Sequence, residues 1–142
     1  MYDAEAVEAI KNLKASYYRC MDTKQWEGWN DVFAVDATLD TREEAPDLDI
    51  VVGRDNIIAF VSNVLEGVTT CHHGHMPEIE LTSDSTATGI WALNDIVIFP
   101  NGMRLDGYGH YHETYVKADG EWWIASSKLT RLHTDFAMPE ES

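Results

Sequence analysis

The spacing of apolar side chains predicts helices in the first half of the chain. In residues 4–21 apolar positions recur three and four residues apart, as one face of an α-helix requires. That face consists of Ile10, Leu13, Tyr17, Cys20 and Met21. A second, short helix is expected over Thr23–Phe33, with Thr23 as its N-cap. A third follows Gly53, where residues 57–65 form an apolar stripe.

After Gly67 the pattern changes to the alternation that is typical of half-buried strands. Long strands are expected over residues 71–81, 86–99, 104–117 and 121–133, with a shorter one over 35–41 and an exposed loop or mobile flap over 42–48. The long strands are joined by Ser83-Asp84-Ser85, Pro100-Asn101-Gly102 and Ala118-Asp119-Gly120. Such turn residues indicate hairpins and a largely antiparallel sheet.

This order of elements predicts one α+β domain over residues 1–142. We expect a cone-shaped, strongly curved, mostly antiparallel sheet with three N-terminal helices packed on its concave side. The mouth of such a cone is a natural pocket for a small molecule.

Composition and charge narrow the class of partner. The 142 residues are 44% hydrophobic, as in an ordinary globular protein. No apolar run approaches the roughly 20 residues that span a bilayer, and the N-terminus does not resemble a signal peptide. Two cysteines, Cys20 and Cys71, are too few for a disulfide framework, so we expect a cytoplasmic protein. The formal charge of −15 argues against nucleic acid and anionic membranes, which require a basic face.

The segment 71–79 is the richest in chemically active groups, because it holds His72, His73 and His75. Three histidines suggest zinc, but neighbours on a strand point to opposite faces, so His72 separates from the other two. The usual zinc-ligand spacings are also missing. We therefore expect neither a metal nor another cofactor. Considered alone, His72 is more often a structural hydrogen-bonding residue than a catalyst.

Asp22 ends the first helical pattern at the edge of its apolar stripe, and Tyr17 lies in the middle of that stripe. A carboxylate near a helix C-terminus gains nothing from the helix dipole and needs a partner, which a histidine on the facing sheet would supply. The alternative is a surface aspartate that terminates the helix.

Alternation also assigns faces on two long strands. Trp91, Leu93 and Asp95 share one face of the second, and Leu129 and Arg131 share one face of the last. Trp91 fits a pocket wall or the core. Asp95 and Arg131 fit a pocket or a surface ion pair.

Several motifs over residues 5–136 resemble the SnoaL-like branch of the nuclear transport factor 2-like superfamily. They are Ile10…Tyr17…Asp22…Trp26, His72-x-Gly74-His75-x-Pro77-Glu78-Ile79, Thr86-Ala87-Thr88-Gly89-x-Trp91-x-Leu93-x-Asp95, Gly107-x-Gly109-His110-Tyr111-x-Glu113-x-Tyr115 and Asp119-Gly120-x-Trp122. Within that branch the motifs are similar to those of scytalone dehydratases and, more closely, of bile acid 7α-dehydratases.

The resemblance implies roles for particular residues. Tyr17, Asp22, His72, Asp95 and Arg131 stand where bile acid 7α-dehydratases place pocket residues. Scytalone dehydratases also have a histidine at the position of His110, which the closer relatives lack. The segment before His72 differs in length, so substrate identity does not transfer.

These positions suit the removal of water next to a carbonyl, which needs a base and an acid. We expect His72, oriented by Asp22, to be the base and Tyr17 to donate a hydrogen bond to the carbonyl oxygen. Arg131 or Asp95 would position the substrate, and protonated His72 or His110 would assist the leaving group. Trp91, Leu93, Tyr18 and Leu129 are the expected substrate-binding residues.

The sequence thus predicts a cofactor-independent dehydratase for a hydrophobic, polycyclic or polyketide- or steroid-like hydroxy-carbonyl compound, acting as a homo-oligomer (dimer or trimer). An isomerase, a cyclase, an epoxide hydrolase and a non-catalytic small subunit of a ring-hydroxylating dioxygenase remain open on the same scaffold. The roles of His73, His75 and His112 also remain open.

Overall fold

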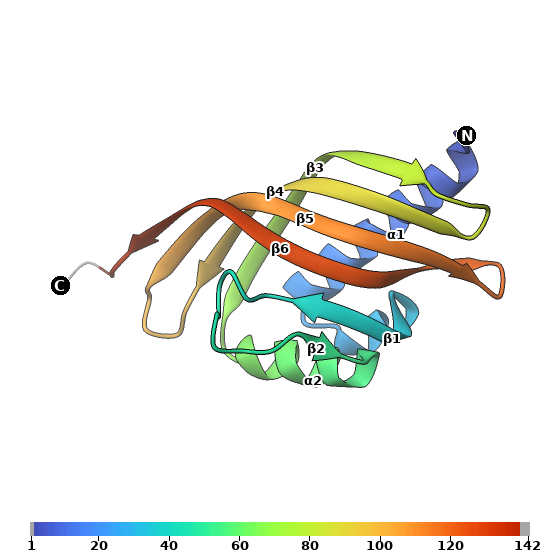
Figure 1. Cartoon of the computed structure of the whole chain (residues 1–142). Coiled ribbons are helices and arrows are strands. Elements are labelled where there is room, and N and C mark those ends of the chain that lie inside the picture. The colour runs from blue at the N-terminus through green and yellow to red at the C-terminus, as the bar shows by residue number, and fades with distance from the viewer. Residues whose placement is uncertain (1, 140–142) are drawn as a thin grey trace.

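A curved six-stranded sheet and the helices that cover its inner face form the domain (Figure 1). The computed structural model describes residues 2–139. The elements are α1 (Ala4–Asp22), the 3-10 helix η1 (Trp26–Asp31), β1 (Phe33–Asp40), β2 (Val51–Val52), α2 (Arg54–Val64), β3 (Thr69–Leu81), β4 (Thr86–Ile98), β5 (Arg104–Ala118) and β6 (Glu121–Ala137). The predicted α+β class is confirmed.

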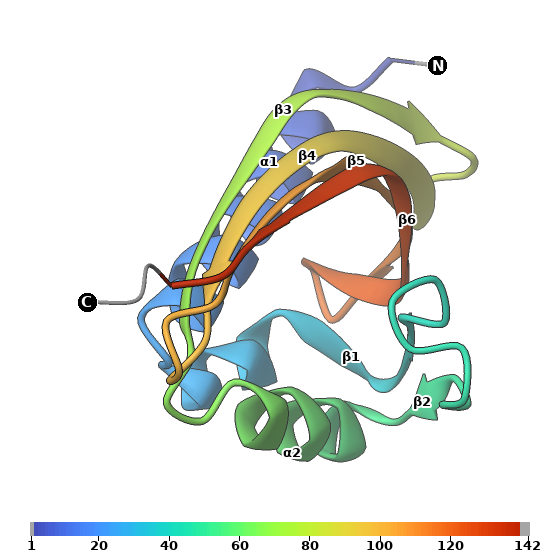
Figure 2. The ribbon, with the colours of Figure 1, turned by 90° about the vertical axis from the view of Figure 1, so that its left-hand side faces the viewer.

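The strand order is β2-β1-β6-β5-β4-β3, and every neighbouring pair is antiparallel except β1 and β6. Figure 2 shows how the long strands arch, with β1, β2 and α2 below the arch. The sheet does not close on itself, because its edge strands β2 and β3 do not pair. The concave side of the arch therefore stays available for a cavity between the sheet and α2.

Helix α1 buries the apolar face that the sequence predicted. The side chain of Asp3 caps its N-terminus by accepting a hydrogen bond from the backbone N–H of Ala6 at 3.1 Å. Ile10 and Tyr17 are buried against the sheet, and α1 contacts β3 and β6. The helix ends at Asp22, which places that carboxylate beside β3.

The expected helix over Thr23–Phe33 is wrong in extent and type. Thr23 caps the end of α1 instead, with its backbone N–H bonded to the carbonyl of Arg19, and Lys24 adopts a left-handed φ of 59°. Only the short 3-10 helix η1 follows. Trp29 anchors it, because its ring stacks on Tyr17 and its Nε1 donates to the Tyr17 carbonyl at 3.1 Å. Thus two α-helices and one 3-10 turn replace the three predicted helices, and α2 follows β1 and β2.

The four long strands and their hairpins are confirmed, with shifted ends. Strand β3 begins at Thr69 rather than Cys71, and β6 continues to Ala137 rather than stopping at His133. The turn at Asp119 and Gly120 has φ values of 54° and 79°, which suit a two-residue hairpin loop.

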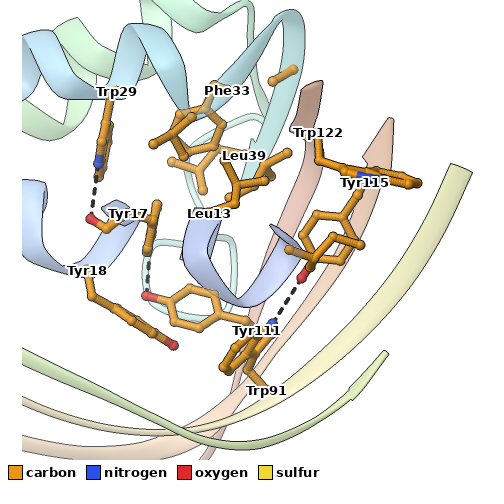
Figure 3. Packing of buried hydrophobic residues seen from close by; sticks show 14 of the residues in the cluster. Leu13, Tyr17, Tyr18, Trp29, Phe33, Leu39, Trp91, Tyr111, Tyr115 and Trp122 are labelled. Carbon is orange, nitrogen blue, oxygen red and sulfur yellow. Dashed lines mark hydrogen bonds between the residues drawn. The ribbon is translucent and has the colours of Figure 1, made fainter. Parts of the chain in front are cut away.

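Aromatic side chains fill the space between α1 and the sheet (Figure 3). Tyr17 packs against Trp29, Phe33 and Tyr111, while Trp91 donates a hydrogen bond to the hydroxyl of Tyr115 at 2.9 Å. This core occupies one part of the inner face of the sheet and leaves the other part to the cavity. Within residues 2–139, no helix is long and apolar enough to cross a membrane.

Candidate active site

A cavity of about 610 Å³ opens under the arch of the sheet, between the end of α1, α2, the loop 41–48 and strands β3–β6. Its lining is mainly apolar, with a few polar groups gathered where the neighbouring strands β3, β4, β5 and β6 run side by side. The lining residues are Tyr17, Met21, Leu39, Thr41, Glu43, Glu44, Ala45, Leu48, Phe60, Val61, Val64, Leu65, Thr70, His72, Asp95, Val97, Phe99, Leu105, Tyr111, Leu129, Arg131, Thr134 and Phe136. This size and mixture are typical of a site for a small organic molecule.

Asp22 and His72 meet at one wall of this cavity, although 50 positions separate them in the chain. The Asp22 Oδ1 lies 2.7 Å from His72 Nδ1, and Oδ2 accepts the backbone N–H of His72 at 2.8 Å. Thr70 donates its hydroxyl to the same carboxylate at 2.8 Å. Three hydrogen bonds from one short piece of β3 thus fix the carboxylate at the end of α1.

These contacts determine the charge of Asp22 and the tautomer of His72. Burial alone would raise the pKa of Asp22, but the hydrogen bonds from His72 and Thr70 outweigh it and lower that pKa. The carboxylate is therefore ionised at neutral pH and can only accept hydrogen bonds. We assign the proton of neutral His72 to Nδ1, since it faces this acceptor, which leaves the lone pair of Nε2 for a substrate.

Asp95 lies directly opposite His72 in the pairing of β3 with β4. Its Oδ2 is 3.7 Å from His72 Nε2, beyond hydrogen-bonding distance but close enough to stabilise an imidazolium ion. Asp95 is held in turn by Arg131, whose Nη1 and Nη2 donate to Oδ1 at 2.6 Å and Oδ2 at 3.0 Å. The site therefore contains an alternating row of charges that begins at Asp22.

The row ends on the loop 41–48, where Glu44 accepts hydrogen bonds from Nε of Arg131 at 2.7 Å and from its Nη2. Burial would lower the pKa of Arg131, but Asp95 and Glu44 outweigh it and raise it above its usual range. Gly107 makes room for this pair, because a Cβ there would collide with both the Arg131 guanidinium and the Asp95 carboxylate. The segment 42–48 is mostly exposed, as expected, and it also covers part of the cavity.

Tyr17 and Tyr111 bring two phenol groups to the same cavity, with their oxygens 3.5 Å apart (Figure 3). Burial raises the pKa of both hydroxyls, so both remain protonated at neutral pH and able to donate. The ammonium group of Lys14 sits over the two rings, 3.8 and 3.7 Å from their centroids. That cation is itself paired with the buried carboxylate of Glu113 at 2.8 Å.

Of the predicted site residues, the structure brings together Tyr17, Asp22, His72, Asp95, Arg131 and Leu129. Tyr18 stacks on the ring of His72, with centroids 6.2 Å apart, but does not line the cavity. Trp91 and Leu93 lie on the predicted inner face but in the core, so the expected tryptophan wall is missing from the cavity lining.

His110 lies on the other face of the sheet. The side chain of its neighbour Tyr111 lines the cavity on the inner face, and the ring of His110 is 6.2 Å from the exposed His112. The structure therefore separates His110 from the cavity, and the leaving-group role expected of it has no geometric support. His73 and His75 are exposed on the outer face of β3, as strand alternation predicted.

Sequence reasoning missed Thr70, Tyr111 and Glu44. Thr70 lies two residues before His72, so strand alternation assigns both to one face. Tyr111 shares its face with Gly107 and Gly109, but the family resemblance of this motif points to its neighbour His110 instead. No local signal marks Glu44, because a long-range contact with Arg131 positions it.

Among residues 2–139, no three or more His, Cys, Asp and Glu side chains are arranged to hold a metal ion. That no cofactor is needed stays a prediction.

Comparison with known proteins places the chain in a family. A family model described as a SnoaL-like domain matches residues 3–128. The "Probable cyclase FGR4" of Gibberella zeae is 26% identical to this chain in an alignment 141 residues long. The alignment covers 91% of this chain and 93% of that protein.

Solved structures of low sequence identity share the fold. A "Putative Scytalone Dehydratase" from Novosphingobium aromaticivorans superposes with a TM-score of 0.83 at 22% identity, covering 95% of this chain and 89% of the other. A hexachlorocyclohexane dehydrochlorinase from Novosphingobium barchaimii gives 0.81 at 16% identity, with 94% and 90% covered. Since the family model matches most of its length, this chain belongs to the SnoaL-like domain family.

Proposed function

We propose that the chain is a cofactor-independent lyase that removes water from a hydrophobic hydroxy-carbonyl compound. The observation that carries this proposal is the Asp22–His72 pair at the cavity wall, with Nδ1 held at 2.7 Å and Nε2 facing the cavity. A histidine oriented in this way is a general base for a proton next to a carbonyl group. The related "Probable cyclase" and the fold shared with a "Putative Scytalone Dehydratase" support chemistry of this kind.

A single histidine can both accept and return the proton in this reaction. Nε2 of His72 takes the proton from the α-carbon, and the electron pair of that C–H bond forms an enolate. When the carbonyl re-forms, the enolate electrons make the new carbon–carbon double bond and the bond to the β-hydroxyl breaks. The departing hydroxide takes the proton back from His72 and leaves as water, so the enzyme returns to its starting state.

The other groups stabilise the charges that appear along this path. A hydrogen bond from Tyr17, with Tyr111 beside it, would stabilise the enolate oxygen in a low-polarity site. The ionised Asp22 at Nδ1 and the carboxylate of Asp95 near Nε2 would stabilise the imidazolium ion. Tyr17 and His72 lie on opposite elements, α1 and β3, so a planar substrate between them would meet both.

A cyclase is the second candidate, because the 26% identical relative carries that name. The first step would be the same proton transfer to His72. The enolate carbon would then attack a second carbonyl of the same molecule instead of expelling hydroxide, and His72 would return its proton to the new alkoxide. A substrate with two carbonyl groups would separate this reaction from elimination.

The alternative of a non-catalytic small subunit predicts a different assembly in solution. It predicts a larger protein that co-purifies with the chain, whereas our proposal expects a homo-oligomer, a dimer or trimer, without other subunits. Light scattering on the purified protein distinguishes these assemblies.

Proton transfer can be tested separately from the net reaction. 1-Tetralone has α-protons but no leaving group, so its exchange in deuterium oxide, followed by NMR, reports the base alone. 3-Hydroxy-1-tetralone additionally reports elimination, since loss of water gives an enone that tautomerises to 1-naphthol. We expect His72→Ala to slow both reactions by about 10²- to 10⁴-fold. His75→Ala is the control, because this exposed histidine of the same strand points away from the cavity. Unchanged exchange in folded His72→Ala, or no exchange by the wild type, would contradict the proposal.

A further inference from the structure

The charges that line the cavity are unequal. Among the described lining residues, Arg131 is the only permanent cation, whereas Glu43, Glu44 and Asp95 contribute three carboxylates. With His72 neutral, the lining therefore carries a net negative charge. Asp22, which lies just behind His72, adds a further negative charge. This negative charge would repel an anion that enters the cavity from water.

Arg131 offers little to such an anion, because two carboxylates already occupy four of its five N–H donors. Asp95 accepts from both terminal nitrogens, and Glu44 accepts from Nε and from Nη2. The Arg131 side chain is only 11% exposed, whereas that of Glu44 is 38% exposed. Glu44 is thus the more solvent-exposed partner of this ion pair.

We propose that Glu44, together with Asp95, neutralises Arg131 and occupies most of its N–H donors, and so restricts the cavity to uncharged substrates. This inference rests on the proposed function of the same site and names its substrate class: neutral compounds of two or three rings that carry a carbonyl group. Carboxylates, phosphate esters and nucleotide-linked thioesters are excluded. Glu44 is a specificity-determining residue in this arrangement and takes no part in proton transfer.

The lining also fits this class. The lining includes the apolar side chains of Val64, Phe99, Leu105 and Phe136, which can contact the apolar body of a ligand. The hydrogen-bonding groups of the proposed reaction belong to His72, Tyr17 and Tyr111, which line the same cavity. A neutral carbonyl needs only hydrogen-bond donors there, and the two protonated phenols supply them. An anion would additionally need a cation whose charge is not already balanced by carboxylates.

A competing arrangement is an anion receptor with a displaceable loop. In that case the carboxylate of a substrate would replace Glu44 on Arg131, and the loop 41–48 would move away. The two arrangements predict opposite ligand preferences, so a binding measurement decides between them without any turnover.

Two ligands of similar size and shape provide the test: 2-acetylnaphthalene, a neutral ketone, and 2-naphthoate, an anion at neutral pH. Isothermal titration calorimetry with the wild type should show the ketone binding at least about tenfold more tightly, because the carboxylates repel the anion. Glu44→Gln keeps the shape of the side chain but removes its charge. We expect it to strengthen naphthoate binding about tenfold and to leave ketone binding nearly unchanged.

Asp47→Asn is the matched control, since it removes the same charge from an exposed position of the same loop that does not line the cavity. It should leave both affinities nearly unchanged. The proposal is overturned if the wild type fails to bind the ketone or binds naphthoate as tightly, or if Glu44→Gln does not improve naphthoate binding. These outcomes are independent of proton abstraction, which the exchange of 1-tetralone measures separately.

Discussion

Two networks of charged side chains occupy the inner face of the same sheet, and they differ in what they leave unpaired. In the core, Lys14 and Glu113 form an ion pair of 2.8 Å with both side chains fully buried. At the cavity, Asp22, His72, Asp95, Arg131 and Glu44 form a longer row that reaches solvent at Glu44.

In the core network both carboxylate oxygens of Glu113 accept hydrogen bonds. Glu113 accepts hydrogen bonds from Lys14, from Ser127 at 2.7 Å and from Tyr115 at 2.9 Å, and aromatic rings surround the ammonium group. In the cavity network, by contrast, His72 Nε2 has its nearest carboxylate oxygen at 3.7 Å. The core network, whose polar groups are paired with one another, holds the helix and the sheet in place. The cavity network leaves one nitrogen, His72 Nε2, that can exchange a proton with a ligand. The contrast supports the assignment of structure to one network and chemistry to the other.

The largest expected effect on stability comes from breaking the core pair on one side. Lys14→Met should leave the Glu113 carboxylate buried without its cation and lower the free energy of unfolding by about 3–5 kcal/mol, as measured by urea denaturation. The double variant Lys14→Met/Glu113→Gln should recover much of this loss, because no buried charge then remains. Lys11→Met, on the exposed side of the same helix, is the control and should change the free energy by less than about 0.5 kcal/mol. Equal stabilities of the Lys14 and Lys11 variants would remove the distinction between the networks.

A medium effect is expected when the cavity network is displaced without the loss of a charge. In Gly107→Ala the new Cβ would collide with Arg131 and Asp95, so that this pair must change its position beside His72. We expect a 10- to 100-fold slower exchange of 1-tetralone, on the order of what misplaced catalytic groups cost. Tyr108→Ala, at the exposed neighbouring position, should exchange at the wild-type rate. Wild-type exchange in folded Gly107→Ala would show that Asp95 and Arg131 do not position the base.

The smallest effect concerns the pH dependence of stability at Asp22. The pKa of Asp22 is lower in the folded chain than in the unfolded one, where it is about 3.9. The ionised carboxylate therefore stabilises the fold at pH values above about 4, and this contribution is lost as the pH falls through the lower, folded pKa. Thermal unfolding should show the wild type more stable than Asp22→Asn at neutral pH, by less than about 2 kcal/mol, and the difference should shrink below about pH 4. A difference that stays constant down to pH 3 would mean that hydrogen bonds from His72 do not depend on the charge of Asp22.

Local patterns predicted much of this molecule because they depend on short-range geometry. The apolar stripe of α1 fixed which side of the helix is buried, and alternation placed His72 on the opposite face of β3 from His73 and His75. The same reasoning failed for residues 23–33, where the packing of Trp29 on Tyr17 accompanies a 3-10 turn instead of an α-helix.

The sequence by itself determined the faces of the elements, and its resemblance to a known family pointed to the pairing of Asp22 with His72. Only the tertiary structure decided which part of a face each residue occupies. Trp91 and Asp95 share the inner face of β4, yet Trp91 lies in the core and Asp95 in the cavity. The four residue steps from Trp91 to Asp95 span about 13 Å along a strand, so the two side chains can lie under different covering segments. Because the segments that cover a face come from distant parts of the chain, such as Glu44 over Arg131, the period of the strand cannot reveal them.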